Sequence, residues 1–204
     1  MADEVRVAME GLFAARRARG FAVADCMAAP ATTAELAVVE QEVGPVPPDL
    51  RALWAVGNGS HGPYDRRYLF GVYALLGTEG ALSSFSDPSL EWSTAWADFY
   101  EFQPRLVDAG RLIPVFTNDH WFLCLRMDDL DRRTLVMIVN DPVEPEEAAV
   151  DTGLSVVDYI ELCTDLLDRG LLHRVGPAIT FIERPPQLWP GLDPRLVGWV
   201  SWGP

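Results

Sequence analysis

The stretch from Thr32 to Gly62 constrains the fold of this chain most strongly, because it contains start and stop signals for two consecutive helices. Thr32 and Glu35 match a capping box, in which two side chains satisfy unpaired N–H groups of the first helical turn. Apolar residues then recur on one helical face as far as Gly44, and glycine readily adopts the positive φ that ends a helix. The sequence therefore predicts a short amphipathic helix between Thr32 and Gly44.

A second helix is predicted directly after a proline-rich turn. Pro47 and Pro48 suit the first helical turn, where an N–H group has no helical partner. The apolar residues that follow have the spacing of one buried helical face: Leu50, Leu53 and Trp54. Residues 57–59, Gly-Asn-Gly, tolerate left-handed backbone, and we expect them to end this helix.

The order of residues across both helices forms a motif. Its members are Glu40, Val43 and Gly44, then Val46 and Pro47, then Asn58 and Gly59. This arrangement resembles the SUKH superfamily of Smi/Knr-like proteins, whose pattern is Glu-x-x-hydrophobic-Gly, a hydrophobic-Pro pair and a helix closing on Asn-Gly. The resemblance covers about residues 30–170, and it implies a structural role for Glu40, Gly44, Pro47, Trp54, Asn58 and Gly59.

The resemblance also implies a function. Members of the superfamily are mostly non-catalytic, and many are bacterial immunity proteins that bind and block a cognate toxin. We therefore expect a protein-binding domain and not an enzyme, with a toxin domain encoded nearby as its partner. An intracellular regulatory or scaffold module of the Smi/Knr type is the alternative.

Patterns downstream of the motif predict an α+β fold. Residues 112–116 and 121–127 match a β-hairpin, and residues 135–139 match a strand that is apolar on both faces. A second capping box at Ser155 starts a helix that Gly170 closes, and residues 178–183 match a last strand. We expect a mainly antiparallel sheet of about four to six strands with helices packed against it, which is SUKH-like.

Further segments have helical or strand-like patterns. A helix over residues 3–19 carries Arg16, Arg17 and Arg19 at its end, which we interpret as compensation of the helix dipole. Residues 67–76 match one strand or two short strands around Gly71. Another helix is predicted to begin at residue 87, with an aromatic stripe that favours core packing: Trp92, Trp96, Phe99 and Phe102.

The length of 204 residues favours a single domain with a sizeable core. We assign residues 1–174 to a SUKH-like domain with an N-terminal helix, and residues 175–204 to a C-terminal extension. The extension is rich in proline and contains Trp189, Trp199 and Trp202. Either it wraps back over the domain and covers a groove or sheet edge, or it presents a surface to a partner.

The net charge and the cysteine content limit the partners and the cellular compartment that we expect. A formal net charge of −14 argues against binding to nucleic acid, and it favours either solubility alone or a basic partner. No apolar run is long enough for a membrane span, and the start of the chain lacks a secretory signal pattern. The three cysteines are widely spaced, so a cytoplasmic location is expected.

Catalytic and metal-binding patterns are weak. The three histidines lack metal-ligand spacing, and Ser60 beside His61 is only a sequence neighbour pair. Residues 128–131 loosely resemble a calcium loop, but Arg133 and Val139 stand where that loop needs Gly and Glu. We therefore expect no catalytic residues, no metal and no cofactor.

Acidic side chains supply the candidate partner-binding surface. A charged turn over residues 128–133 and a loop over residues 141–147 both lie at expected strand ends. Their candidate contact residues are Asp128, Asp129, Asp131, Glu144, Glu146 and Glu147. Such carboxylates suit a basic active-site face on a toxin.

Overall fold

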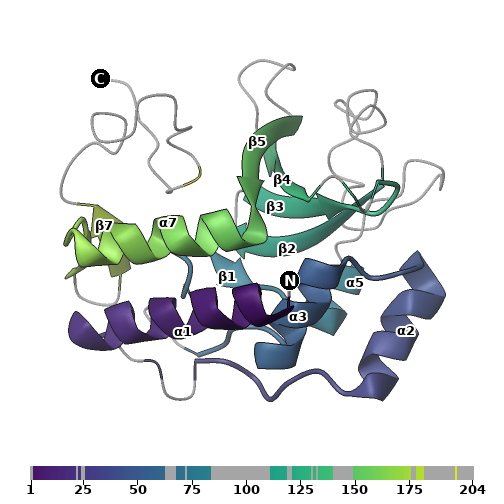
Figure 1. The fold of residues 1–204 in the computed structure, drawn as a ribbon, viewed down its shortest axis with the longest axis horizontal. Coiled ribbons are helices and arrows are strands. Elements are labelled where there is room, and N and C mark those ends of the chain that lie inside the picture. Colours follow the sequence, from purple (N-terminus) through teal and green to yellow (C-terminus); the bar gives the residue numbers. More distant parts are fainter. Residues whose placement is uncertain are drawn as a thin grey trace.

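A computed structural model of the chain describes residues 2–21, 23, 26–62, 68–71, 73–83, 111–118, 121–129, 131, 133–139, 149–175, 178–181 and 196 (Figure 1). Within these residues, a five-stranded antiparallel sheet has the order β1-β2-β3-β4-β5. Its strands are β1 (Ala74–Leu75), β2 (Leu112–Asn118), β3 (Trp121–Arg126), β4 (Thr134–Val139) and β5 (Ala149–Ser155). The helices are α1 (Ala2–Ala18), α2 (Thr33–Val43), α3 (Pro48–Val56), α5 (Thr78–Ser83) and α7 (Val156–Asp168). The α+β prediction is confirmed.

The sheet has the predicted hairpin at its centre. Strands β2 and β3 pair antiparallel up to Asn118 opposite Trp121. Strand β4 is covered on both faces, as its apolar sequence predicts, because Leu135 and Met137 join the main core while Val136 and Ile138 join a second cluster. No helix in the described part of the chain is long and apolar enough to cross a membrane.

Helices α1 and α7 lie side by side and cover one face of the sheet (Figure 1). Leu12 of α1 and Ile160 of α7 are fully buried in the main core. The capping box predicted for α7 is present, since the Ser155 hydroxyl accepts a hydrogen bond from Asp158 N and an Asp158 carboxylate oxygen accepts one from Ser155 N. Local sequence signals therefore set the start of this core helix.

Arg16, near the end of α1, has a tertiary role that the dipole interpretation missed. Arg16 is completely buried, and its Nη1 donates to the carbonyl oxygens of Tyr68 and Leu69 at 3.3 and 3.2 Å. Its guanidinium carbon lies 5.0 Å from the centre of the Phe21 ring. Arg16 follows Leu12 by four residues, so it falls on the buried face of α1, a spacing that indicates its burial.

Short elements account for most of the differences from the sequence prediction. Helix α5 and strand β5 were not predicted, because α5 has six residues and β5 lacks alternating burial. The strand expected over residues 67–76 is shorter: β1 has two residues, and a β-bridge joins Phe70 to Tyr73 around Gly71, whose φ is +67°. The aromatic helix predicted from residue 87 lies outside the described residues.

The chain pairs across the expected domain boundary. Strands β6 (Leu172–Val175) and β7 (Ala178–Phe181) form a separate antiparallel pair. Further on, Leu196 is 2 % exposed and packs in the main core, and its carbonyl oxygen lies 3.3 Å from the Tyr159 hydroxyl. The tryptophans Trp189, Trp199 and Trp202 lie outside the described residues. At Leu196, then, the C-terminal extension contacts the domain.

Leu196→Ala is expected to lower the free energy of unfolding by about 2–4 kcal/mol, because it removes buried methyl groups and leaves a cavity. Denaturant unfolding measures the change. Val38→Ala is the control, since Val38 is 52 % exposed, and it should stay within about 0.5 kcal/mol of the parent. Removing the residues after Glu183 should act in the same direction as Leu196→Ala. Equal stability of the Leu196 and Val38 variants would contradict packing of the extension on the domain.

Candidate functional site

The two motif helices form as the sequence predicts. Thr32 Oγ1 accepts a hydrogen bond from Glu35 N at 3.2 Å, and Glu35 Oε2 accepts one from Thr32 N at 2.7 Å. Val39 and Val43 are buried on the inner face of α2. Gly44 follows with a φ of +89°, and its N–H donates to the Glu40 carbonyl. Helix α2 therefore has the capping box and the glycine end that were predicted.

The motif side chains make contacts within the fold. The Glu40 carboxylate forms an ion pair with Arg51 of α3. Pro47 is the residue before α3, which begins at Pro48. Trp54 is completely buried, and its Nε1 donates to the Leu76 carbonyl at 2.8 Å. These contacts hold α3 between α2 and the segment that leads into α5.

The end of α3 differs from the prediction. The helix ends at Val56, and Gly57 has an extended backbone with φ −175°, so no left-handed residue stops the helix there. Gly59 has a φ of +96°, and a Cβ atom on it would lie 2.8 Å from Gly77 N. A Cβ atom on Gly77 would lie 2.5 Å from the Asn58 carbonyl oxygen. The two glycines let two loops approach closely, which is a tertiary reason that a helix-stop pattern does not show.

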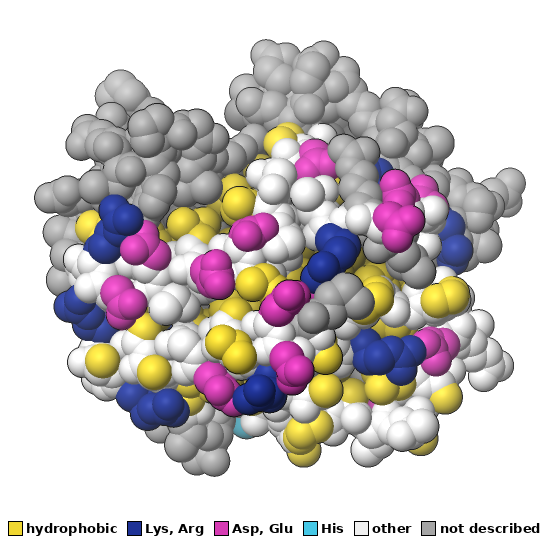
Figure 2. Space-filling model, in the orientation of Figure 1, with side chains coloured by type: hydrophobic (Ala, Val, Ile, Leu, Met, Phe, Trp, Pro, Cys, Tyr) yellow, Lys and Arg dark blue, Asp and Glu magenta, His cyan; other side chains and the backbone are white. Residues whose placement is uncertain are grey.

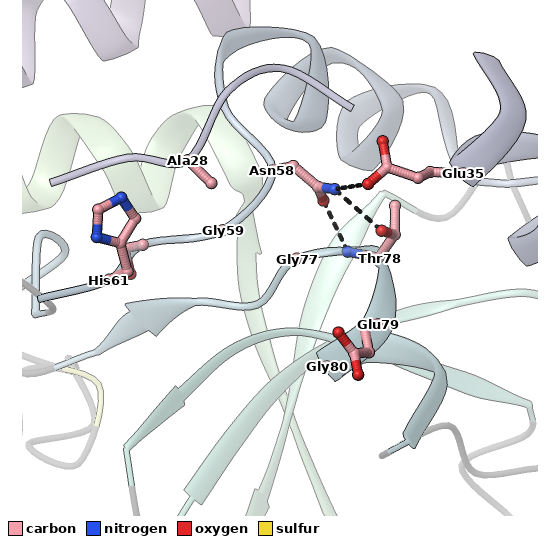
Figure 3. A pocket seen from close by; sticks show the side chains of 10 residues that line it. Ala28, Glu35, Asn58, Gly59, His61, Gly77, Thr78, Glu79 and Gly80 are labelled. Atoms are coloured by element: carbon pink, nitrogen blue, oxygen red, sulfur yellow. Dashed lines mark hydrogen bonds between the residues drawn. The ribbon is translucent and has the colours of Figure 1, made fainter. Parts of the chain in front are cut away.

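The Asn58 side chain links three segments (Figure 3). Its Nδ2 donates to Glu35 Oε1 at 3.1 Å and to Thr78 Oγ1 at 3.0 Å. Its Oδ1 accepts from Thr78 N at 2.7 Å. One carboxamide thus joins the first turn of α2, the loop after α3 and the start of α5.

Backbone hydrogen bonds reinforce this junction. Residues 26–31 run beside the loop after α3, since Ala28 N donates to Gly59 O at 2.9 Å and Asn58 N donates to Ala29 O at 3.1 Å. On the other side of the loop, Ser60 N donates to Leu75 O at 2.9 Å, and the Ser60 hydroxyl accepts from Leu75 N at 2.8 Å. The Ser60 hydroxyl is therefore part of the backbone framework.

A hollow of about 260 Å³ opens where these segments meet (Figure 3). We call it the Asn58 hollow, and it is lined by Ala28, Glu35, Asn58, Gly59, Ser60, His61, Gly77, Thr78, Glu79 and Gly80. Hydrogen bonds from the Thr32 backbone and hydroxyl, and then from Asn58, lower the pKa of Glu35 despite some opposing desolvation. Glu35 is therefore ionised at neutral pH. The sequence did not indicate this hollow, because its lining comes from four separate segments.

We call the charged turn over residues 128–133 the acidic turn. It lies at the opposite end of α3 from the Asn58 hollow. Asp128, Asp129 and Asp131 are exposed between β3 and β4. Arg133 is not a freely exposed part of this turn: its Nε and Nη2 donate to the two carboxylate oxygens of Asp49 at 2.8 and 2.5 Å. Asp49 belongs to the first turn of α3, and 3 % of its side chain is exposed. The ion pair ties the acidic turn to α3.

The other predicted contact residues belong to the loop over residues 141–147. Glu144, Glu146 and Glu147 lie outside the described residues.

Within the described part of the chain, no group of three or more His, Cys, Asp or Glu residues could hold a metal ion. None of the three cysteines forms a disulfide, and burial raises the pKa of the Cys163 thiol to about 12. That thiol is protonated at neutral pH and is a poor nucleophile.

No protein-family model matches the chain, and a search of curated proteins finds no match. Membership of the SUKH superfamily therefore stays a prediction from the sequence motif.

Substitutions at two motif glycines should separate backbone strain from close approach. Gly44→Ala should lower the free energy of unfolding by about 1–3 kcal/mol, the cost of its positive-φ extended backbone for an L-residue. Gly59→Ala should lower it by about 1–3 kcal/mol more, because its Cβ also meets the Gly77 backbone, whereas nothing lies within 4 Å of a Cβ on Gly44. Gly59→Val should be at least as destabilising as Gly59→Ala. An unchanged melting temperature for the Gly59 variants would show that the two loops do not meet as described.

Asp49→Asn should lower the free energy of unfolding by about 1.5–3 kcal/mol, the range for hydrogen bonds to charged groups. This range is lower than the cost of breaking a fully buried ion pair, because Arg133 keeps 34 % of its side chain exposed to solvent. Asp131→Asn in the same turn should change stability by less than about 0.5 kcal/mol. A double-mutant cycle with Arg133→Met isolates the pair, and zero coupling energy would contradict the link between the acidic turn and α3.

Proposed function

We propose that this chain is a protein-binding domain of the immunity type, which neutralises a toxin domain encoded nearby by occluding its active site. The observation that supports this proposal is the difference in exposure between the motif residues and the acidic turn, which lie at and around α3. Glu40, Trp54, Asn58 and Gly59 contact other parts of the chain, while the carboxylates of Asp128, Asp129 and Asp131 are exposed. Such an arrangement favours recognition by a rigid surface.

The anchoring of the acidic turn favours binding. The bidentate pair between Arg133 and Asp49 holds one end of the turn against α3. A contact surface that is ordered before binding loses less conformational entropy in the complex. Asp128, Asp129 and Asp131 present negative charge to a basic surface, and the net charge of −14 adds long-range attraction.

A surface over α1 and α7 is the other candidate for partner contact. On the face shown in Figure 2, acidic and basic side chains both lie over these two helices, and acidic ones predominate over α7. Arg6 pairs with Glu10 at 2.6 Å, and Arg169 pairs with Asp165 at 2.7 Å. These pairs engage part of the charge, but α7 carries Asp158, Glu161, Asp165 and Asp168 against Arg169 alone, so the association rates of variants of the two surfaces decide between them.

The protein encoded beside this gene is the first partner to test. It should co-purify with the chain, and co-expression should relieve its toxicity to growing cells. If it binds but is not toxic, the chain is a regulatory or scaffold module of the Smi/Knr type. Absence of binding together with turnover of a substrate by the purified chain would refute a protein-binding function.

Association should be electrostatically steered, so its rate constant should fall as salt concentration rises. Replacing Asp128, Asp129 and Asp131 by lysine should slow association at low salt by about tenfold or more, with little effect on folding. The matched control replaces Asp3, Glu161 and Asp168, which are exposed on α1 and α7, and changes the net charge equally. Stopped-flow fluorescence measures both rates. Equal slowing in the two triple variants would contradict contact through the acidic turn.

A further inference from the structure

We propose that the Asn58 hollow is a subsite for a cationic side chain, arginine or lysine, presented by the partner protein. This inference rests on the proposed function and adds a second, more specific contact to the acidic turn.

The size of the hollow suits one side chain. Its volume of about 260 Å³ is below the roughly 300 Å³ at which pockets for drug-sized ligands begin. The lining is polar, with one asparagine, one serine, one threonine, one histidine and two glutamates. A long, flexible side chain with a polar end fits such a space better than an apolar group does.

The charges of the hollow favour a cation. Glu35 enters from α2 and Glu79 from α5, on either side of the hydrogen bonds between Asn58 and Thr78 (Figure 3). No arginine is among the described lining residues, and Glu79 has no ion pair or hydrogen bond in the described part of the chain. An arriving guanidinium or ammonium group would form charge-assisted hydrogen bonds with two carboxylates that have no arginine partner among the lining residues.

The hollow is ordered before any ligand arrives. Glu35 Oε2 accepts hydrogen bonds from the Thr32 N–H and hydroxyl, and Glu35 Oε1 accepts one from Asn58. The carboxylate is therefore held in one orientation, and Oε1, which accepts one hydrogen bond, has a lone pair left for a cation. Its fixed position lowers the entropic cost of binding a cation.

The position of the hollow suits a partner that also contacts the acidic turn. Asp49, which anchors that turn, lies in the first turn of α3, and the hollow follows the last. A nine-residue helix is about 13 Å long, a distance within the reach of a protein interface of standard size.

Titration with blocked single residues tests the subsite without the natural partner. The probes are Nα-acetyl-arginine amide, Nα-acetyl-lysine amide and the neutral isostere Nα-acetyl-citrulline amide, added to the full chain. Two-dimensional NMR follows the Asn58 side-chain amide and the Gly59 backbone amide. We expect saturable shifts of both signals with the arginine or lysine probe, and none with citrulline.

Variants of the two glutamates show whether charge is the cause. Glu79→Gln should weaken binding about two- to fivefold, the worth of one exposed charge pair. Glu35→Gln keeps the capping box, because glutamine serves at that position too, so a combined Glu35→Gln and Glu79→Gln variant should fold and bind about tenfold more weakly. Unshifted backbone amide signals in α1 and α7 before titration confirm that fold, because neither helix lines the hollow that contains Glu35 and Glu79. Glu161→Gln on α7 is the control and should leave binding unchanged.

The inference is overturned if citrulline binds as well as arginine, if neither cationic probe gives saturable shifts, or if the double variant binds like the parent. Those results do not contradict the proposed function, because that function is tested by binding of the neighbouring protein and by the association rates of the acidic-turn variants. Conversely, failure of the neighbouring protein to bind does not alter the probe titration.

Discussion

The Asn58 carboxamide is the interaction on which the motif region depends. Its three hydrogen bonds join α2, the loop after α3 and α5, which are far apart in the sequence. The close approach of Gly59 to Gly77 follows from the same contact, because the two loops must nearly touch for Asn58 to reach Thr78. A partly buried polar network of this kind specifies one arrangement when every member is satisfied.

Helix α3 is fixed at both ends by polar contacts and along its length by packing. At its first turn Asp49 pairs with Arg133, and beyond its last turn Asn58 bonds to Thr78. Between these ends Leu50, Leu53 and Trp54 are completely buried. The two surfaces that we propose for partner contact lie at the two ends of this helix, so the same contacts that stabilise α3 also order the surfaces.

Local sequence signals predicted the structure well where the cause is local. Both capping boxes depend on residues three apart, and the β2–β3 hairpin pairs strands that are close in the sequence. The two-sided burial of β4 follows from its uninterrupted apolar sequence. Contacts between distant segments could not be read in this way. Arg133 is 84 residues from Asp49, and nothing in the spacing of either residue indicates the other.

The same limit applies to the candidate site. Glu40, Gly44, Pro47, Asn58 and Gly59 were identifiable because they follow a short linear pattern, but the contacts that they make were not. The Asn58 hollow requires Ala28, Glu35, Asn58 and residues 77–80 to meet, and the unpredicted helix α5 supplies one wall. The acidic turn was identifiable as exposed charge, whereas the anchoring of Arg133 was not, since a charged residue in a charged turn gives no sign of a buried partner.

Amide hydrogen exchange on the complex with the protein encoded by the neighbouring gene tests the central claim, that recognition occurs at the two ends of α3. The account predicts slower exchange in residues 58–61, 77–80 and 128–131 when the partner is bound, and unchanged exchange along α1 and α7. Protection confined to α1 and α7, with the ends of α3 unaffected, would contradict it.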